Sequence, residues 1–457
     1  MPAASPAPER RGVWRTSRNP QVLASPLRVP AGETWRYLIA YAFQVAPRII
    51  GLMLNIKPMP GPGQDFPVGV DFMLTNRIEG LDPADAVPLT RNHVEPNPHA
   101  GGEPAIMVKN PPQVGFVPWG ARRADGSPHP HAGTGFAGLV APARPVDDRH
   151  GTDAYLDRTG RKLYTGDQYH QVLEFRHLRY DGRRMAISEP SFWPAQRTID
   201  GYLPLNMGMS GAISDGDDLL LPLVAKKPGS SLGLCGVSRW QRRGGDWEAV
   251  AFVPITPEDD SIEPSLVRDL DGSLLFLARG RRHQGPPVRI WRQAPRTESW
   301  RLIIHRQRLT NSTPITLNSA VDGTPYLLMN LYEPEFRVPG APAAEGGISR
   351  LEPKGRRGER SSICLLALNE ARNDFATPLL ARDPLVEFGV PPRGTIWAAD
   401  HATATVVQLR DGEWHSVYGY RILEWIENTH MTPPSPQTGC YLDEAFSIGP
   451  AVPPWNF

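Results

Sequence analysis

Cysteine is scarce in this chain, which has 3 cysteines among 457 residues. Cys235, Cys364 and Cys440 lie far apart, so they form neither the closely spaced pairs of a zinc site nor a disulfide framework. Cys235 and Cys364 sit inside apolar runs, as buried thiols do. The scarcity excludes a small disulfide-stabilised fold and fits a reducing compartment.

An excess of charge of one sign is also absent. The chain has 49 Lys and Arg against 48 Asp and Glu, a net charge of +1, so no basic surface is predicted for nucleic acid or an anionic membrane. Only residues 37–56 approach membrane-spanning length, and a central Pro47-Arg48 disfavours a spanning helix there. Because no signal-peptide pattern opens the chain, we expect a cytoplasmic location, with secretion as the alternative if the recorded start is misassigned.

Proline and glycine are plentiful, at 50 and 43 residues, and they punctuate apolar runs as turns do. Residues 1–32 are rich in Pro, Arg and Ala and are expected to be a flexible N-terminal arm. Residues 33–430 are expected to form a single domain, followed by a C-terminal tail over 431–457. Within the domain, residues 35–56 fit a helix or a closing strand, and residues 57–100 are loop-like.

The stretch from Ser261 to Arg279 has two short apolar runs on either side of Asp271-Gly272, which predicts a β-hairpin with mostly buried strands. Glu263 stands at its entrance and Arg279 at its exit. Because the two ends of a hairpin meet at one rim of a sheet, these side chains are expected to lie close together. An ordinary surface ion pair is the alternative.

The same pattern repeats along the chain. Asp-Gly turns at Asp215, Asp271 and Asp322 recur at a period of about fifty residues, and a later one follows at Asp411. A second strand pair with an aromatic-closed turn follows most of them, over 240–247, 292–300 and 368–375. Two hairpins per period make one four-stranded blade, so we predict an all-β propeller of six blades, with five or seven as alternatives and a sandwich as the rival.

At these positions the chain resembles the sialidase superfamily. The aromatic-closed turns resemble worn Asp-boxes (BNR repeats), and Glu263 and Arg279 are similar to the glutamate and the substrate-binding arginine that superfamily carries on adjacent inner strands. The segment that begins at Arg360 is similar to the one in which another arginine of the binding triad precedes an inner strand. The resemblance implies a glycoside hydrolase in which Glu263 is catalytic and Arg279 and Arg360 bind the substrate.

Two converging guanidinium groups form a planar, permanently charged clamp for a carboxylate. An acidic sugar, sialic or uronic, is therefore the expected ligand, carried by an oligosaccharide or polysaccharide. The alternative for both arginines is a solvated surface position.

The nucleophilic tyrosine of the superfamily is absent near Thr403, where it would be expected, and the first-blade arginine and the aspartate acid/base have no counterpart within 35–120. Close to the missing tyrosine stand Trp397, Asp400 and His401. A histidine beside a carboxylate can transfer protons near neutral pH, so Asp400 and His401 are candidate catalytic residues, and Trp397 is a candidate for substrate binding. A structural histidine at a strand end is the alternative.

Other histidines lie in proline-rich loops, His93 and His99 in one and His129 and His131 in another. Such loops line a propeller mouth or bind a metal, and we assign His93 to substrate binding. Because no metal-ligand spacing on a helix occurs, no metal and no cofactor are expected, with a structural cation in the propeller channel left open. The acidic run that starts at Asp215 is expected to be turn chemistry rather than a calcium site.

The leading hypothesis is therefore a sialidase-like glycoside hydrolase. A uronate lyase or rhamnosidase-like enzyme with a histidine base is the second hypothesis, and a non-catalytic propeller that binds glycan or protein is the third. The sugar, the linkage and the oligomeric state are not encoded in any pattern of this sequence.

Overall fold

A computed structural model describes a little more than half of the chain. The described residues are 21–24, 35–47, 49–58, 70–76, 87–91, 93–96, 104–107, 113–123, 125–145, 170–189, 191–193, 197–280, 287–306, 315–319, 325–329, 363–375, 379–382, 396–401, 405–410, 413–425 and 439–444. At some strand positions only the backbone is described.

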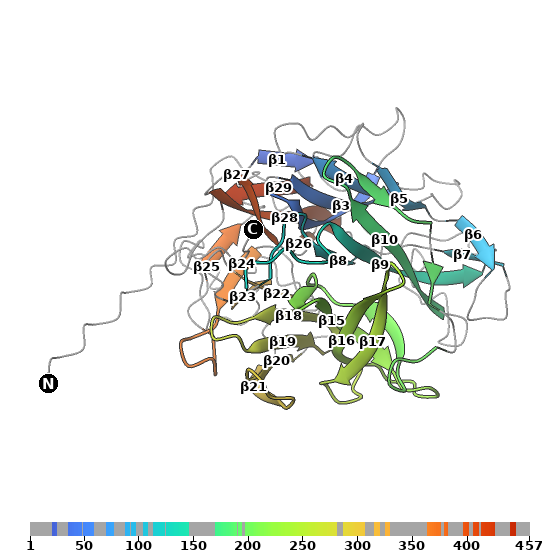
Figure 1. The fold of residues 1–457 in the computed structure, drawn as a ribbon. Helices are drawn as coiled ribbons and strands as arrows, with labels where there is room; N and C mark the ends of the chain where they lie inside the picture. Colours follow the sequence, from blue (N-terminus) through green and yellow to red (C-terminus); the bar gives the residue numbers. More distant parts are fainter. Residues whose placement is uncertain are drawn as a thin grey trace, which may run out of the picture.

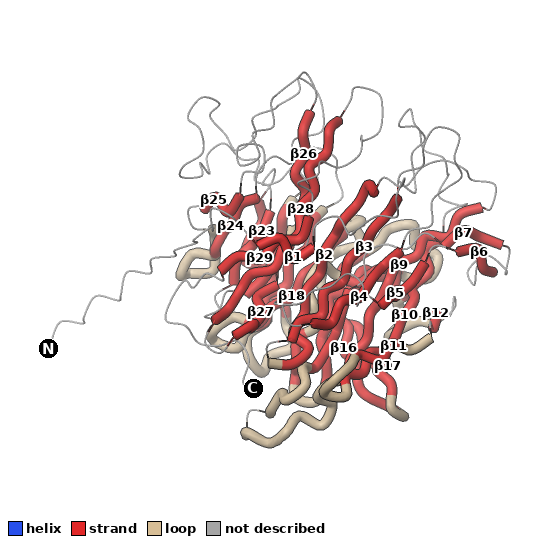
Figure 2. Tube along the Cα trace, turned by 90° about the horizontal axis from the view of Figure 1, so that it is seen from above, coloured by secondary structure: helices blue, strands red, loops and turns tan. Residues whose placement is uncertain are grey.

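These residues contain 29 β-strands and no helix (Figure 2), and the strands form six antiparallel sheets. We number the sheets along the chain and treat each as one blade. Sheet 1 consists of β2 (Trp35–Ala46), β3 (Ile49–Pro58), β4 (Val70–Asn76) and β5 (Val87–Arg91). Sheet 2 consists of β6 (His93–Pro96), β7 (Pro104–Met107), β8 (Gln113–Val117), β9 (Thr134–Pro145), β10 (His170–Tyr180), β11 (Met185–Ile187) and β12 (Ser191–Phe192).

The next two sheets contain the best-described part of the molecule. Sheet 3 consists of β13 (Leu203–Met207), β14 (Ile213–Asp215), β15 (Asp218–Lys226), β16 (Leu234–Arg243) and β17 (Asp246–Pro254). Sheet 4 consists of β18 (Ile262–Arg268), β19 (Leu274–Arg279), β20 (Val288–Gln293) and β21 (Trp300–Arg306).

The last two sheets complete the set. Sheet 5 consists of β22 (Thr316–Ser319), β23 (Pro325–Met329), β24 (Ile363–Ala367) and β25 (Leu379–Arg382). Sheet 6 consists of β26 (Ile396–His401), β27 (Thr405–Arg410), β28 (Glu413–Trp425), β29 (Gly439–Glu444) and the N-terminal strand β1 (Gln21–Ala24).

The sheets follow one another around a ring, as Figure 1 shows. Strands of successive sheets contact each other: β2 contacts β8, β9 contacts β13, β18 contacts both β15 and β22, and β24 contacts β26. The ring closes where β2 contacts β27 and β28 of the last sheet. The predicted all-β propeller is therefore confirmed, and the sandwich is excluded because two stacked sheets would not form a closed ring.

The N-terminal strand completes the last sheet, because β1 pairs with β29 in antiparallel register, Gln21 opposite Leu442. β1 lies inside the segment expected to be a flexible arm, and β29 lies inside the expected tail. The last sheet therefore takes strands from both ends of the described chain. The reason is that the free edge of β29 offers unpaired backbone groups that the start of the chain can satisfy.

The apolar core lies between adjacent sheets. On β19, Leu275 and Leu277 enter a cluster shared with sheet 5, whereas Leu274, Phe276 and Ala278 enter a cluster shared with sheet 3. Side chains alternate between the two faces of a strand, and both faces of this strand are covered. This explains why β19 is a continuous apolar run in the sequence rather than an alternating one.

Two sequence-based expectations near the N-terminus change. Residues 35–56 form neither a helix nor the closing strand, but the hairpin of β2 and β3. Residues 57–100, expected to be loops, contain β4, β5 and β6. The prolines of this segment indicated loops and so hid the strands from the sequence-based prediction. Pro88, for example, lies on β5, an edge strand, where a missing backbone donor is tolerated. No helix that could span a membrane occurs in the described chain.

Candidate functional site

The hairpin from Ser261 to Arg279 forms as predicted, and a β-bulge places Glu263. Ile262 pairs with Arg279 and Ser265 pairs with Leu277, so Glu263 and Pro264 together oppose a single residue of β19. Glu263 has a φ of 53°, in the left-handed region that residues with a Cβ atom rarely adopt. Bulges of this kind re-aim a side chain, and strained backbone in a folded protein is often found at functional sites.

Arg279 binds Glu263 directly. Its Nε donates to Glu263 Oε2 at 2.6 Å, and its Nη2 lies 2.5 Å from the same oxygen. The Arg279 side chain is 7% exposed and that of Glu263 is 22% exposed, so the carboxylate is the accessible member of the pair. Since both contacts use Oε2, Oε1 of Glu263 has no hydrogen-bond partner within the described part of the chain.

This pairing changes what each group can do. A carboxylate that is fixed through one oxygen can use the other as a general base or as a nucleophile. Arg279 binds Glu263 through two of its nitrogens, Nε and Nη2, and its Nη1 has no partner among the residues that the structure describes. The expected two-arginine clamp therefore starts from an arginine that is already half engaged by a neighbouring glutamate.

Residues of sheet 3 hold the bulge through hydrogen bonds and close packing. Met209 N donates to Pro264 O at 2.6 Å, and the Ser210 hydroxyl both accepts from Leu266 N at 2.8 Å and donates to Leu266 O at 3.2 Å. Gly208 packs so closely that a Cβ atom there would lie 2.3 Å from Pro264 O. The backbone that carries Glu263 is thus held by the loop between β13 and β14.

Three further residues of the predicted site lie in sheet 6. Asp400 and His401 end β26, opposite Arg421 and Tyr420 of β28, and Trp397 lies on the same strand. The structure describes only the backbone at these positions. Their catalytic and binding roles stay predictions.

The side chains of the remaining two predicted residues, His93 and Arg360, are not among those that the structure describes. His93 begins β6 opposite Met107, with only its backbone described, and Arg360 lies outside the described residues. Among the predicted site residues, the structure describes the side chains of Glu263 and Arg279, and these two contact each other.

The loop with His129 and His131 lies at the opposite rim. His129 Nε2 lies 3.1 Å from Gly216 O, at the Asp-Gly turn between β14 and β15, and its Nδ1 accepts from His131 N at 3.2 Å. Partial burial lowers the pKa of the His131 imidazole. β14 and β18 both run toward the Asp-Gly turns, so this rim is the far end of the strands from Glu263.

The acidic run at that rim forms ion pairs with arginines. Arg239 donates to Asp215 at 2.7 Å and to Asp218 at 2.8 Å, and Arg123 donates to Asp217 at 2.8 Å. No group of three or more His, Cys, Asp and Glu side chains suited to a metal ion occurs among the described residues. Each of these carboxylates is therefore paired with an arginine, and their expected role in turns rather than in a calcium site stays a prediction.

Sequence reasoning missed a buried arginine that binds the turn before Glu263. Arg289 Nη1 lies 2.6 Å from Asp259 Oδ2, and its Nη2 donates to Ser261 Oγ. Partial burial raises the pKa of Asp259, but the hydrogen bonds from Arg289 and Ser261 outweigh this and hold the pKa below its ordinary value. The signal available in the sequence was the Asp-x-Ser pattern at Asp259 and again at Asp271.

Comparisons with known proteins support the fold. No family model and no curated protein matches the chain. A protein of unknown function from Dyadobacter fermentans shares the fold at a TM-score of 0.50 and 13% identity, covering 96% of this chain and 99% of that one.

Sialidases are among the other solved structures that the chain resembles. The NanB sialidase of Streptococcus pneumoniae has a TM-score of 0.49 at 8% identity, with coverage of 93% of this chain and 70% of that one. A Trypanosoma rangeli sialidase has a TM-score of 0.45 at 10% identity, with 90% of this chain but only 53% of that chain covered. We take no site residue from these similarities.

Proposed function

We propose that this protein is a carbohydrate-active enzyme, a glycoside hydrolase for glycans that end in an acidic sugar, with Glu263 as its catalytic carboxylate. One observation carries the proposal: Glu263 stands in a strained bulge on the innermost strand of its sheet, fixed through Oε2 by buried Arg279, with Oε1 left unpaired among the described residues. A structural ion pair would not need a left-handed backbone to form. The strain is consistent with a carboxylate held for chemistry.

The proposed roles follow from the chemistry of each group. Glu263 Oε1 acts as a nucleophile or general base at the sugar, and Arg279 keeps the other oxygen in place. Arg279 Nη1, together with Arg360, binds the carboxylate of the sugar, since guanidinium groups match carboxylates in shape and charge. Asp400 and His401 stand in place of the absent nucleophilic tyrosine and supply proton transfer.

The test is a substitution that keeps the shape of the side chain. The protein is assayed on fluorogenic sialic, uronic and neutral glycosides, and Glu263→Gln is then measured on whichever substrate is cleaved. We expect a loss in kcat of at least about 100-fold, the contribution typical of a catalytic acid or base. Glu298→Gln is the matched control, because Glu298 is exposed in the turn between β20 and β21, at the far rim.

Three outcomes decide between the hypotheses. Hydrolysis that survives in Glu263→Gln contradicts the proposal. Release of an unsaturated uronate, seen by its ultraviolet absorbance, identifies the lyase instead. Glycan binding by calorimetry without turnover of any substrate identifies a non-catalytic propeller.

A further inference from the structure

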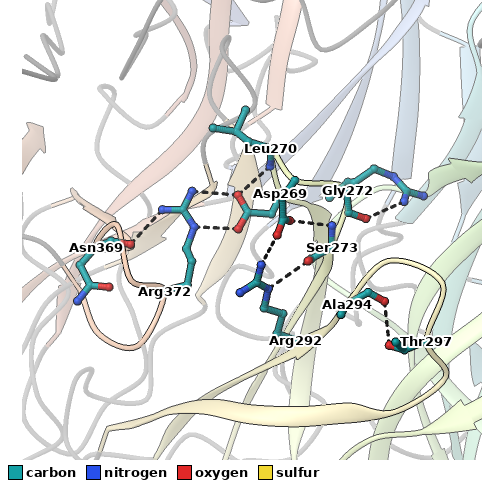
Figure 3. A network of polar contacts seen from close by, with 11 residues as sticks. Asp269, Leu270, Gly272, Ser273, Arg292, Ala294, Thr297, Asn369 and Arg372 are labelled. Carbon is teal, nitrogen blue, oxygen red and sulfur yellow. Dashed lines mark hydrogen bonds and ion pairs between the residues drawn. The ribbon is translucent and has the colours of Figure 1, made fainter. Parts of the chain in front are cut away.

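Two arginines of β20 bind the same kind of turn at opposite ends of β18. Arg289 contacts Asp259 and Ser261, which precede β18, and Arg292 contacts Asp271 and Ser273, which follow it. Each unit is an Asp-x-Ser sequence held by one guanidinium, and Figure 3 shows Arg292 and Ser273 of the second unit. The two units differ in what lies beside them, because only the first is next to Glu263.

The Arg289 unit is the more buried of the two. Arg289 is 8% exposed, its guanidinium carbon lies 5.3 Å from the centre of the Trp291 ring, and the Ser261 residue is fully buried. Ser261 Oγ donates to Asp259 Oδ1 at 2.5 Å. The arginine, the aspartate and the serine therefore close a compact set of contacts around the turn that leads into β18.

That turn carries concentrated backbone strain. Asp260 has a φ of 64° and Glu263 a φ of 53°, both in the left-handed region. Asp260 is tied to sheet 3, since its N donates to Gly233 O at 2.9 Å and its Oδ1 accepts from Gly233 N at 3.2 Å. Ser261 O accepts from the buried thiol of Cys235 at 3.1 Å. A strained segment persists only where surrounding contacts hold it.

We propose that Arg289 is a positioning residue for Glu263, which it holds in register with Arg279 by fixing Asp259 and Ser261. Arg289 does not touch Glu263, so it acts through the turn. The catalytic meaning of this role rests on the proposed function, whereas the holding of the turn does not.

The geometry explains why an arginine is needed. Arg289 reaches Asp259 through Nη1 and Ser261 through Nη2, and a planar group with several fixed donors makes both contacts at once. A lysine has a single charged nitrogen and reproduces them poorly. Without the two contacts, the turn at Asp260 can relax its strain, and Glu263 moves relative to Arg279.

The test compares Arg289→Met with Arg292→Met, which removes the same kind of arginine from the same strand but at the far rim. Hydrogen exchange measured by mass spectrometry follows the amides of residues 259–263. We expect exchange in this segment to be about tenfold or more faster in Arg289→Met and unchanged in Arg292→Met. Arg289→Lys should restore part of the protection, and it replaces Arg289→Met if that variant fails to fold.

A double-mutant cycle separates positioning from general stability. On a substrate that the protein cleaves, Arg289→Met should lower kcat by about tenfold or more with a small effect on KM. In the Glu263→Gln background the same substitution should cause no further loss. Equal, additive losses in both backgrounds overturn the positioning role.

The two proposals fail in different ways. If no glycoside is cleaved, the proposed function fails, and the exchange rates alone decide whether Arg289 holds the turn. If residues 259–263 keep their protection in Arg289→Met, the inference about Arg289 is overturned even in an active enzyme.

Discussion

At the scale of single residues, backbone strain is concentrated beside the proposed site. Five non-glycine residues of the described chain have a positive φ: Asp200, Asp260, Glu263, Arg296 and Arg372. Asp200, Arg296 and Arg372 lie in turns, where such a conformation is common. Asp260 and Glu263 fall within one short segment at the start of β18. Each costs about 1–3 kcal/mol, a cost that the surrounding contacts must offset.

The loop between β13 and β14, which contacts the bulge at Glu263, can be tested by a single substitution. In Gly208→Ala, the new methyl group would lie 2.3 Å from Pro264 O and 2.4 Å from Pro222 Cγ, so the backbone of Pro264 must move. We expect a loss of about 1–3 kcal/mol in the free energy of unfolding, as for other overpacked sites, together with reduced turnover. Denaturant unfolding and the glycosidase assay measure the two effects.

Gly211→Ala is the control for this substitution. A Cβ atom at Gly211 meets its nearest neighbour, Val114 O, at 3.4 Å, which is an ordinary contact. A stable and fully active Gly208→Ala protein would show that the loop does not hold the bulge.

At the scale of secondary-structure elements, arginines join neighbouring sheets at the rim of the Asp-Gly turns. Arg123 of sheet 2 binds Asp217 of sheet 3, and Arg268 of sheet 4 lies 3.4 Å from Asp215 of sheet 3. Arg372, in the turn after β24 of sheet 5, binds Asp269 of sheet 4 (Figure 3). The same turn chemistry thus fixes the relative positions of successive blades.

The pair of Arg372 and Asp269 is the most buried of these contacts. Arg372 Nε lies 2.8 Å from Asp269 Oδ2 and its Nη2 lies 3.0 Å from Oδ1, with side-chain exposures of 11% and 3%. In Arg372→Met the Asp269 carboxylate loses its counter-charge in a buried position. We expect a loss of about 3–5 kcal/mol in the free energy of unfolding, measured by chemical denaturation.

A second substitution tests this explanation. Adding Asp269→Asn to Arg372→Met removes the unpaired charge and should recover part of the loss. Arg301→Met, at an exposed position on β21, should leave stability unchanged. If Arg372→Met behaves like Arg301→Met, the pair does not join the two sheets energetically.

At the scale of the whole molecule, the ring depends on a strand from the beginning of the chain. β1 supplies the outer strand of sheet 6 by pairing with β29, and β2 then begins sheet 1 beside β28. The first and last sheets are therefore joined both by side-by-side contact and by the path of the chain.

Removal of β1 tests this closure. A chain that starts at residue 26 lacks β1, and a chain that starts at residue 20 keeps it, so the difference between the two isolates the strand. We expect the shorter chain to melt about 5 °C or more lower and to associate through the exposed edge of β29. Differential scanning calorimetry and light scattering measure these effects, and equal behaviour of the two chains would show that β1 does not stabilise the ring.

Much of the fold was predictable because its signals are local. The hairpin over Asp271-Gly272 formed as expected, since turn residues and flanking apolar runs act on near neighbours in the chain. β5 was missed because Pro88 indicates a loop, while its edge position, which permits the proline, is a property of the assembled sheet.

By itself, the sequence determined the all-β repeat and the placement of Glu263 and Arg279 at the two ends of one hairpin. Only the tertiary structure decided that these two residues bind each other, that Glu263 lies in a left-handed bulge, and that Arg289 holds the turn before it. The physical reason is distance along the chain. Hairpins form between adjacent segments, whereas Met209 and Ser210 hold the bulge and Gly233 holds the turn before it, all three from loops of sheet 3. No local pattern records contacts between sheets.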